Sequence, residues 1–391
     1  MRRSRSIVPL LAMVAAAAPL AAQSAGDAGA FVVRLGRDTV GVERFARSAG
    51  RIEEDIVTRT PSTLVRHVVW TLGANGDVAQ VEMTIRRPGA APTAQPLQAL
   101  LATFLGDSAV VESRRDTAVQ RRSFPLPHGV VPLLVPSSWA SVELATMRAD
   151  RQDVDSLRLP AWYLGFEETF LDVVRLNDDS MVVRNKYDTW HARVDRSGRI
   201  LGTVPVAGGT EQFSLERVRS ADIAALAQAW VANESRGSAM GQLSTRDTVR
   251  ASVAGATLWV DYGRPLKRGR VIFGGVVPWN RLWRTGANEA TQFRTDHALE
   301  IGGVVLPAGM YTLWTIPSPG GWKLVFNTET GQWGTDHHAD RDLYQLDMRA
   351  ATLPQAVERL TISVRPEGQG GGVLAIEWDA TQAAIPFAVR Q

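Results

Sequence analysis

The sequence contains no cysteine and only three lysines, Lys186, Lys267 and Lys323. The lack of cysteine excludes disulfides, thiol catalysis, cysteine-ligated metals, covalent haem attachment and a lipid-modified cysteine. Beyond residue 25 no uninterrupted apolar run is long enough to cross a bilayer, so we expect no transmembrane segment in the mature chain. We therefore expect a protein that is held together by the packing of its core alone.

Residues 1–25 have the three-part layout of a secretory signal peptide. Arg2, Arg3 and Arg5 precede an apolar stretch over residues 7–20 that is rich in alanine and leucine. The sequence AAQSA then offers small residues for cleavage between Ala22 and Ala25. The arginine pair lacks the following apolar residue that a twin-arginine signal requires, which favours general secretion. We expect a periplasmic or secreted protein.

The charge balance argues against a nucleic-acid partner. The chain has 43 basic and 40 acidic residues, and the three arginines of the expected signal peptide account for the excess. The mature chain is therefore close to neutral, whereas nucleic-acid binding depends on a basic surface that neutralises phosphates. We expect no nucleic-acid partner and no cofactor.

The residues that follow this leader alternate between apolar and polar types over short stretches, as β-strands do. A turn at Asn75, Gly76 and Asp77 predicts a hairpin. Two helices are also expected, a short one over residues 97–105 and an amphipathic one over residues 220–233 with Ser220 as its N-cap. We predict that residues 28–232 form a curved antiparallel sheet with one or two helices. An apolar inner face of such a sheet would also permit carriage of a lipid or another apolar ligand.

Residues 233–246 lose this periodicity and gather glycine, serine and charged residues, which predicts a linker. From residue 247 to residue 391 the sequence reads as seven or eight short strands, including residues 269–277, with no long helix. We expect an antiparallel β-sandwich of immunoglobulin-like or jelly-roll-like type. Tyr311 follows a glycine turn and is expected to fix a corner with its hydroxyl while its ring enters the core.

Four segments of this C-terminal region are distinctive: VDYGRPLKRGRVIFGG, PWNRLWRTGANEATQFRTD, GGVVLPAGMYTLWTIP and FNTETGQWGT. Together they resemble the bacterial exported family known as domain of unknown function 2911. The resemblance covers roughly residues 244–389 and does not extend to the N-terminal region. It implies a β-sandwich in an exported bacterial protein, and it brings no activity.

The segment WRTGANEA, residues 283–290, is the densest polar cluster of this region. Arg284, Asn288 and Glu289 are suited to orient a ligand, with Trp283 as an apolar platform. The alternative is a structural turn in which Arg284 and Glu289 pair with each other and Asn288 bonds the backbone. The residue types favour the structural turn, which the paired side chains would brace. A ligand-binding site and the active site of an exported hydrolase remain as alternatives.

A second cluster, YGRPLKRGR, brings several cations together. Its candidate residues are Tyr262, Arg264, Lys267, Arg268 and Arg270. Forked guanidinium groups in a loop can hold an anion or an acidic partner. There is no phosphate-loop spacing, so nucleotide binding is not expected. The alternative is a solvated turn.

The only metal-like cluster is TDHHADRDLYQLD, with Asp336, His337 and His338 as weak candidates. Adjacent side chains of an extended chain point to opposite sides, so we expect a polar loop rather than a metal site. The same divergence applies to the carboxylate pair Glu53-Glu54, of which one member is expected to be solvated. No G-x-S-x-G nucleophile motif is present.

Twelve tryptophans are present, and seven of them fall in the C-terminal region. Core packing accounts for them, and stacking on a ligand is the alternative. We interpret the chain as a non-catalytic binding or interaction protein of the cell envelope that recognises a small ligand or an envelope protein. An exported hydrolase and an accessory subunit of an envelope complex are the alternatives.

Overall fold

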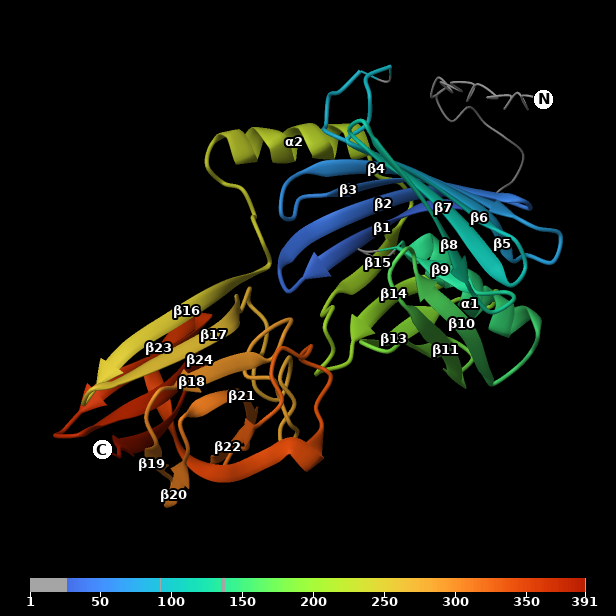
Figure 1. Cartoon of the computed structure of the whole chain (residues 1–391). Helices are drawn as coiled ribbons and strands as arrows, with labels where there is room; N and C mark the ends of the chain where they lie inside the picture. Colours follow the sequence, from blue (N-terminus) through green and yellow to red (C-terminus); the bar gives the residue numbers. More distant parts are fainter. Residues whose placement is uncertain (1–26, 92, 135–137, 391) are drawn as a thin grey trace, which may run out of the picture.

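The computed structural model describes residues 27–390 with the exception of residues 92 and 135–137. The expected signal peptide, residues 1–25, lies outside the described residues. Within them the chain is mainly β, with two α-helices and two open, antiparallel sheets, as the sequence predicted (Figure 1). In this part of the chain no helix is long and apolar enough to cross a membrane.

The first sheet contains fifteen strands from residues 27–218. They are β1 (Asp27–Leu35), β2 (Asp38–Ser48), β3 (Arg51–Thr58), β4 (Leu64–Leu72), β5 (Val78–Arg86), β6 (Gln98–Phe104), β7 (Ser108–Arg115), β8 (Ala118–Pro125), β9 (Val131–Leu133), β10 (Ser156–Tyr163), β11 (Glu168–Asn177), β12 (Ser180–Arg184), β13 (Thr189–Val194), β14 (Ile200–Pro205) and β15 (Ser214–Val218). The order runs from β8 down to β1, then from β15 down to β9, and only β9 and β10 pair in parallel. The predicted turn at residues 75–77 joins β4 to β5.

The sheet is strongly curved because its two edges are neighbours along the chain. The edge strands β8 and β9 are joined by residues 126–130 alone. Such a connection reaches at most about 20 Å, so the two edges must approach each other there. The result is an arch that is open along one side.

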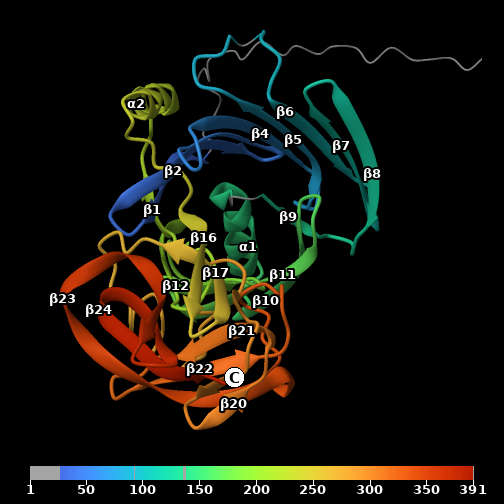
Figure 2. The same cartoon turned by 60° about the vertical axis from the view of Figure 1, so that its left-hand side comes forward.

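Helix α1 (Trp139–Arg151) lies inside this arch, as Figure 2 shows, and its apolar residues join the core of the first sheet. The concave face is therefore largely filled, which leaves little room for the apolar cargo considered above. Helix α2 (Ile223–Ser235) packs on the outer face, against β2 and β3. Its N-cap is Asp222, whose side chain accepts a hydrogen bond from the Ala225 amide, so the predicted N-cap at Ser220 was wrong.

The predicted helix over residues 97–105 was also wrong, because these residues form β6. Strand β6 pairs with β5 on one side and with β7 on the other. The leucine spacing in so short a segment fits either structure. The two neighbouring strands supply partners for its backbone groups, and this tertiary pairing overrides the local pattern.

The second sheet contains nine strands from residues 244–389. They are β16 (Ser244–Val253), β17 (Ala256–Pro265), β18 (Thr291–Thr295), β19 (Leu299–Ile301), β20 (Val304–Leu306), β21 (Gly309–Ile316), β22 (Trp322–Asn327), β23 (Asp342–Glu367) and β24 (Gly371–Val389), and a short 3-10 helix, η1 (Ala339–Arg341), precedes β23. The long strand β23 pairs with β22 through its first residues and with β24 through the rest. Both groups of strands contribute to one core, so the sheet folds over it as a sandwich. Tyr311 fixes a corner as predicted, since its hydroxyl donates to the Pro307 carbonyl at 2.9 Å.

Residues 266–290, between β17 and β18, form turns and isolated bridges instead of a regular strand. The strand predicted over residues 269–277 is therefore wrong. Gly274 has a φ of +84°, and a Cβ there would lie 2.4 Å from the Trp279 indole nitrogen. This backbone conformation is one that β-branched strand residues avoid, and it turns the chain back on itself. The irregular segment contains most of both predicted binding clusters.

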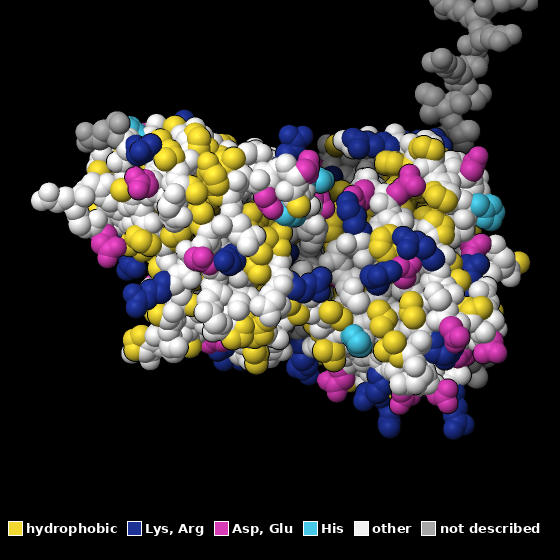
Figure 3. Space-filling view, turned by 90° about the horizontal axis from the view of Figure 1, so that it is seen from below, with side chains coloured by type: hydrophobic (Ala, Val, Ile, Leu, Met, Phe, Trp, Pro, Cys, Tyr) yellow, Lys and Arg dark blue, Asp and Glu magenta, His cyan; other side chains and the backbone are white. Residues whose placement is uncertain are grey.

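The first sheet with its two helices (residues 27–235) and the second sheet with its loops (residues 244–390), here called the two halves, contact each other mainly through loops. The turn between β1 and β2 contacts the 266–270 loop, where the Arg37 amide donates to the Arg268 carbonyl and Arg268 pairs with Asp38 at 2.7 Å. Farther along, the Gly208 amide donates to the Val276 carbonyl at 3.2 Å. A hollow lies between the two halves on the face seen in Figure 3.

Nine of the twelve tryptophans are buried, and Trp259, Trp279 and Trp333 are half-buried. Trp283, Trp322 and Trp378 pack with Phe273 in one aromatic cluster of the second core. Burial of each such ring contributes roughly 1.5–3 kcal/mol or more to folding. Core packing is therefore the main role of the tryptophans.

Candidate functional site

The WRTGANEA segment is a turn that the backbone braces at both ends. Trp283 exchanges two backbone hydrogen bonds with Thr315 of β21, at 2.8 and 2.9 Å. Glu289 forms an isolated bridge with Trp333. Between them, the Trp283 indole donates to the Gly286 carbonyl at 3.2 Å. The braced turn is thus present, but the side chains that brace it are not the expected ones.

Arg284 and Glu289 do not pair with each other, so that part of the structural interpretation was wrong. Glu289 pairs with Arg246 of β16 at 2.9 Å on the surface. Asn288 has a φ of +64°, and its carbonyl accepts from the Gly334 amide at 2.9 Å. The side chains of Arg284 and Glu289 therefore lie in different surroundings, because the backbone between them is irregular.

Arg284 points inward and is buried with only 8% of its surface exposed. The carbon stem of Arg284 passes so close to Gly334 that a Cβ there would lie 1.8 Å from its Cδ. One guanidinium nitrogen, Nη2, donates a long hydrogen bond of 3.4 Å to the Gly209 carbonyl of the first half. The Nε atom is buried and has no hydrogen-bond partner. A guanidinium has five N–H donors, so Arg284 is incompletely satisfied.

A cavity of about 220 Å³ opens beside this guanidinium, between the two halves of the chain. Its lining consists of Gly208, Pro278, Leu282, Trp283, Arg284, Trp314, Gly334, Thr335 and His337. Asn288 and Glu289 do not line it. The cavity is therefore mainly apolar in its side chains, with a single buried guanidinium, as small-molecule sites often are.

A carboxyl group of the first half lies near Arg284. Burial raises the pKa of Asp188 to about 6, while hydrogen bonds from the Glu211 and Thr210 amides and the charge of Arg284 oppose this rise. Burial lowers the pKa of Arg284, and the charge of Asp188 opposes that shift. The structure gives no direct ion pair between these two residues. Gly209 lies between them, with its Cβ position 2.4 Å from an Asp188 carboxylate oxygen.

The cations of YGRPLKRGR do not converge on one anion site. Tyr262 is buried, and its hydroxyl accepts from the Ile362 amide at 3.0 Å. Arg264 donates to Asp247, Leu360 and Thr361, and Lys267 donates to Asp379.

Arg268 and Arg270 are also engaged within the fold. Arg268 reaches Asp38 of the first sheet, and Arg270 donates to the carbonyls of Leu266 and Lys267. Burial, with repulsion from Arg268, lowers the pKa of Arg270 to about 10. These side chains hold the loop and the junction together, which the cation pattern alone did not reveal.

His337 and His338 point to different partners, as expected for adjacent residues. His337 lies 2.8 Å from a carboxylate oxygen of Asp342, and its ring packs edge-on against Trp314. His338 lies 2.7 Å from Glu329, and hydrogen bonding to this carboxylate raises the pKa of His338. Asp336 is near the Thr335 hydroxyl instead. Nowhere in the described part of the chain do three or more His, Cys, Asp or Glu residues gather as a metal site.

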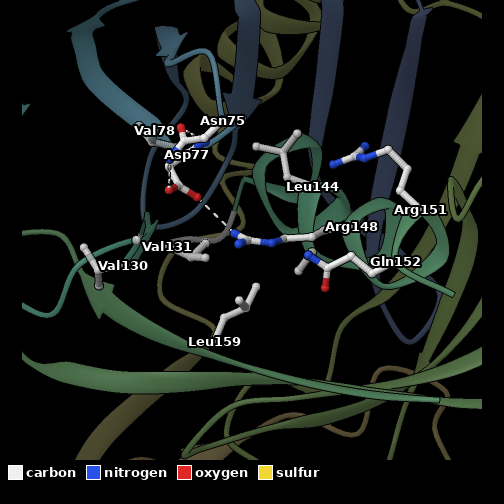
Figure 4. A pocket seen from close by; sticks show the side chains of 13 residues that line it. Asn75, Asp77, Val78, Val130, Val131, Leu144, Arg148, Arg151, Gln152 and Leu159 are labelled. Atoms are coloured by element: carbon white, nitrogen blue, oxygen red, sulfur yellow. Dashed lines mark hydrogen bonds and ion pairs between the residues drawn. The ribbon is translucent and has the colours of Figure 1, made fainter. Parts of the chain in front are cut away.

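A second, smaller cavity of about 160 Å³ remains between α1 and the first sheet (Figure 4). Apolar side chains such as Leu144 and Leu159 form its wall. Arg148 crosses it to pair with Asp77 at 3.0 Å. This ion pair connects α1 to the β4–β5 turn. We therefore interpret the cavity as space left by imperfect packing beside the helix.

Three glutamates are buried inside the arch, and of these the sequence had drawn attention only to Glu54, as one member of the Glu53-Glu54 pair. Glu43 accepts from the Trp139 and Ala140 amides at the N-terminus of α1, each at 2.8 Å. Glu54 accepts from the Ser138 hydroxyl at 2.8 Å, while Glu53 points outward, as the divergence argument predicted. Burial raises the pKa of Glu43 to about 7, and it raises the pKa of Glu54 well above its usual value. Glu43 thereby satisfies two amides at the start of α1, and Glu54 satisfies the hydroxyl of its N-cap.

The third glutamate, Glu143 of α1, accepts from Arg47 and Arg217 at 2.8 and 2.7 Å. Arg47 and Arg217 also bind Asp27 of β1. In the sequence, the burial of Glu43 and Glu54 was indicated only by their positions in β2 and β3, which the alternation of apolar and polar residues assigns to the interior. Without knowledge of α1, such a pattern looks like a strand with two solvated faces.

Comparison with known proteins identifies the second half of this two-sheet protein. Residues 244–387 match the model of the family described as "Protein of unknown function (DUF2911)", so the resemblance drawn from the motifs is confirmed for this part. No family model matches the first half, and no curated protein matches the chain.

One solved structure, a DUF1089 family protein from Pseudomonas aeruginosa, is similar at 11% identity and a TM-score of 0.31. The similarity covers 43% of this chain and 90% of that chain. Such a likeness is too weak to support an argument.

Proposed function

We propose that this protein is an exported, non-catalytic binding protein of the cell envelope. We further propose that it holds a small ligand in the cavity between the loop of residues 206–213 and the Trp283-Arg284 segment. The observation that carries this proposal is the buried guanidinium of Arg284, which lines a 220 Å³ cavity with its Nε unpartnered.

Several features of the cavity support a binding role. A buried polar group without a partner costs about 1–3 kcal/mol, and more when it is charged. A ligand that supplies an acceptor removes this cost, so the unbound protein is prepared for one. The cavity also lies where the two halves meet, a common position for ligand sites.

The same geometry favours binding over hydrolysis. A hydrolase at WRTGANEA would need Asn288 or Glu289 beside a bound substrate. Glu289 instead pairs with Arg246, and neither residue lines the cavity. The export part of the proposal depends on the basic and apolar pattern of residues 1–25.

Native mass spectrometry of the full mature chain, after exposure to an envelope extract, tests the binding role. We expect a bound small molecule that the Thr335→Phe variant no longer retains, because the new ring fills the cavity. Thr330→Phe is the matched control, since Thr330 is exposed and does not line the cavity. A bound molecule that survives Thr335→Phe would place the ligand elsewhere. A stoichiometric protein partner without any small molecule would favour an accessory subunit.

Cell fractionation tests the export role. We expect the full chain outside the cytoplasm and a chain that lacks residues 1–25 inside it. Retention of both chains in the cytoplasm would contradict export.

A further inference from the structure

We infer, on the basis of the proposed binding function, that the ligand of this cavity is a small monocarboxylic acid with an apolar body about the size of one six-membered ring. The chemical character of the lining, its charge and its volume each contribute to this inference.

The buried guanidinium of Arg284 favours a carboxylate as the polar group of the ligand. Arg284 is the one Lys, Arg, Asp or Glu residue in the lining, and it is buried with its Nε unpartnered. Within the described residues, its donor contact is the 3.4 Å bond from Nη2 to Gly209. A carboxylate matches the planar fork of a guanidinium through two parallel hydrogen bonds. A bound cation would meet repulsion here, and a purely apolar ligand would leave the guanidinium unsatisfied.

In the part of the chain that the structure describes, the guanidinium of Arg284 is not neutralised by a direct ion pair, although the carboxyl of Asp188 lies nearby. One Asp188 oxygen accepts from the Glu211 amide at 2.6 Å, so this carboxyl holds the 209–211 backbone. Asp188 does not line the cavity and forms no direct ion pair with Arg284. The charge of Asp188 therefore acts on Arg284 from a distance. The guanidinium of Arg284 still has hydrogen-bond donors that a ligand can bind.

The walls of the cavity favour a ligand with an apolar body. Trp283, Trp314, Leu282 and Pro278 present rings and aliphatic groups to the cavity. The His337 ring is held against Trp314 with a centroid distance of 4.9 Å, and its Nε2 is engaged with Asp342. Such walls favour a flat or compact apolar body over inorganic phosphate or a sugar, which need polar partners on every side.

The volume of the cavity suits a small ligand. A dry protein cavity of about 150 Å³ accommodates benzene. The present cavity of about 220 Å³ therefore has room for a ring and a carboxylate. Benzoate and cyclohexanecarboxylate are suitable probes of this class.

The test compares acids with their neutral isosteres on the full mature chain by isothermal titration calorimetry. We expect benzoate to bind at least tenfold more tightly than benzamide, and more tightly than acetate or inorganic phosphate. Arg284→Gln should weaken benzoate binding at least tenfold. Arg281→Gln is the matched control, because it removes the same charge from an exposed residue three positions away that does not line the cavity.

The comparison of benzoate with benzamide uses the unaltered protein, so it holds even if Arg284→Gln does not fold. Equal binding of both, lost in Thr335→Phe, would overturn the carboxylate class and leave the binding function standing. If every probe fails to bind while native mass spectrometry finds another bound molecule, the carboxylate class is also overturned and the binding function still stands. Failure of every probe with no native ligand would overturn both proposals.

Discussion

Arg284 and Asp188 belong to different halves of the chain, and the charge of each opposes the pKa shift that burial causes in the other, although no direct ion pair joins them. Gly209 lies between them, since its carbonyl accepts from Arg284 and a Cβ at this position would lie 2.4 Å from an Asp188 carboxylate oxygen. The site therefore exists only when the two halves are docked. Ligand binding and the docking of the halves are expected to stabilise each other for this reason.

Replacement of Gly334 by alanine tests how tightly the Arg284 side chain is positioned. A Cβ at residue 334 would lie 1.8 Å from Arg284 Cδ and 2.4 Å from the Asn288 carbonyl. We expect the free energy of unfolding to fall by about 1–3 kcal/mol through overpacking, as measured by urea denaturation. Gly320→Ala is the control, because a Cβ there meets nothing within 4 Å. Equal stability of the two variants would show that both the Arg284 side chain and the Asn288 backbone move aside freely.

The Glu289→Ala variant separates the surface of the turn from the cavity. Glu289 pairs with Arg246, and both side chains are substantially exposed. Exposed ion pairs contribute about 0.2–1 kcal/mol, so we expect a loss of stability below about 1 kcal/mol. Ligand affinity should be unchanged. A tenfold loss of affinity in calorimetry would return Glu289 to the binding site.

The buried glutamates predict how stability depends on pH. Glu43 and Glu54 have raised pKa values, so above their usual value of 4.5 the folded state holds more protons than the unfolded state. The contribution of Glu43 is therefore complete at low pH and is lost as the pH rises from about 4.5 through about 7. The contribution of Glu54 is likewise complete at low pH and is lost as the pH rises above 4.5. Glu54→Gln mimics the protonated form and should raise stability at pH 8 more than at pH 5. Denaturation series at both values check this expectation.

Glu53→Gln is the control for that comparison, since Glu53 lies next to Glu54 but is partly exposed. The control should leave the pH dependence nearly unchanged. If Glu54→Gln and Glu53→Gln gave the same slope, the buried carboxyl would not be the source of the effect.

The two helix N-caps offer a matched pair. Ser138 is buried, caps α1 and donates to Glu54, whereas Asp222 caps α2 on the surface. Asp222→Ala should cost about 1 kcal/mol. Ser138→Ala should cost more, about 1–3 kcal/mol, because it also removes the donor to a buried carboxyl. Chemical denaturation ranks the two, and the reverse order would contradict the assigned role of Glu54.

The junction predicts cooperative unfolding. Arg268 is buried and pairs with Asp38 of the first sheet at 2.7 Å. Arg268→Ala should split or broaden the calorimetric transition, because inter-domain contacts of this kind couple the unfolding of two cores. Arg34→Ala is the control, since Arg34 forms an exposed pair within the first sheet. A single sharp transition in both variants would show that the pair does not couple the halves.

Much of the fold could be predicted from the alternation of apolar and polar residues and from the turn residues. The hairpin at residues 75–77, the corner at Tyr311 and the β character of both halves follow from local patterns. Residues 97–105 show the limit of such patterns. Their leucines suit a helix locally, yet two flanking strands recruit them into β6.

The sequence by itself determined which residues are chemically distinctive: Arg284, the cations of YGRPLKRGR and the adjacent histidines. Only the tertiary structure decided what each of them contacts. Arg284 meets Gly209, 75 residues away, and Glu289 meets Arg246, 43 residues away. Glu43 meets a helix that begins 96 residues later. Long-range packing sets the burial and the partner of a charge, and these two quantities decide whether it braces the fold or remains available to a ligand.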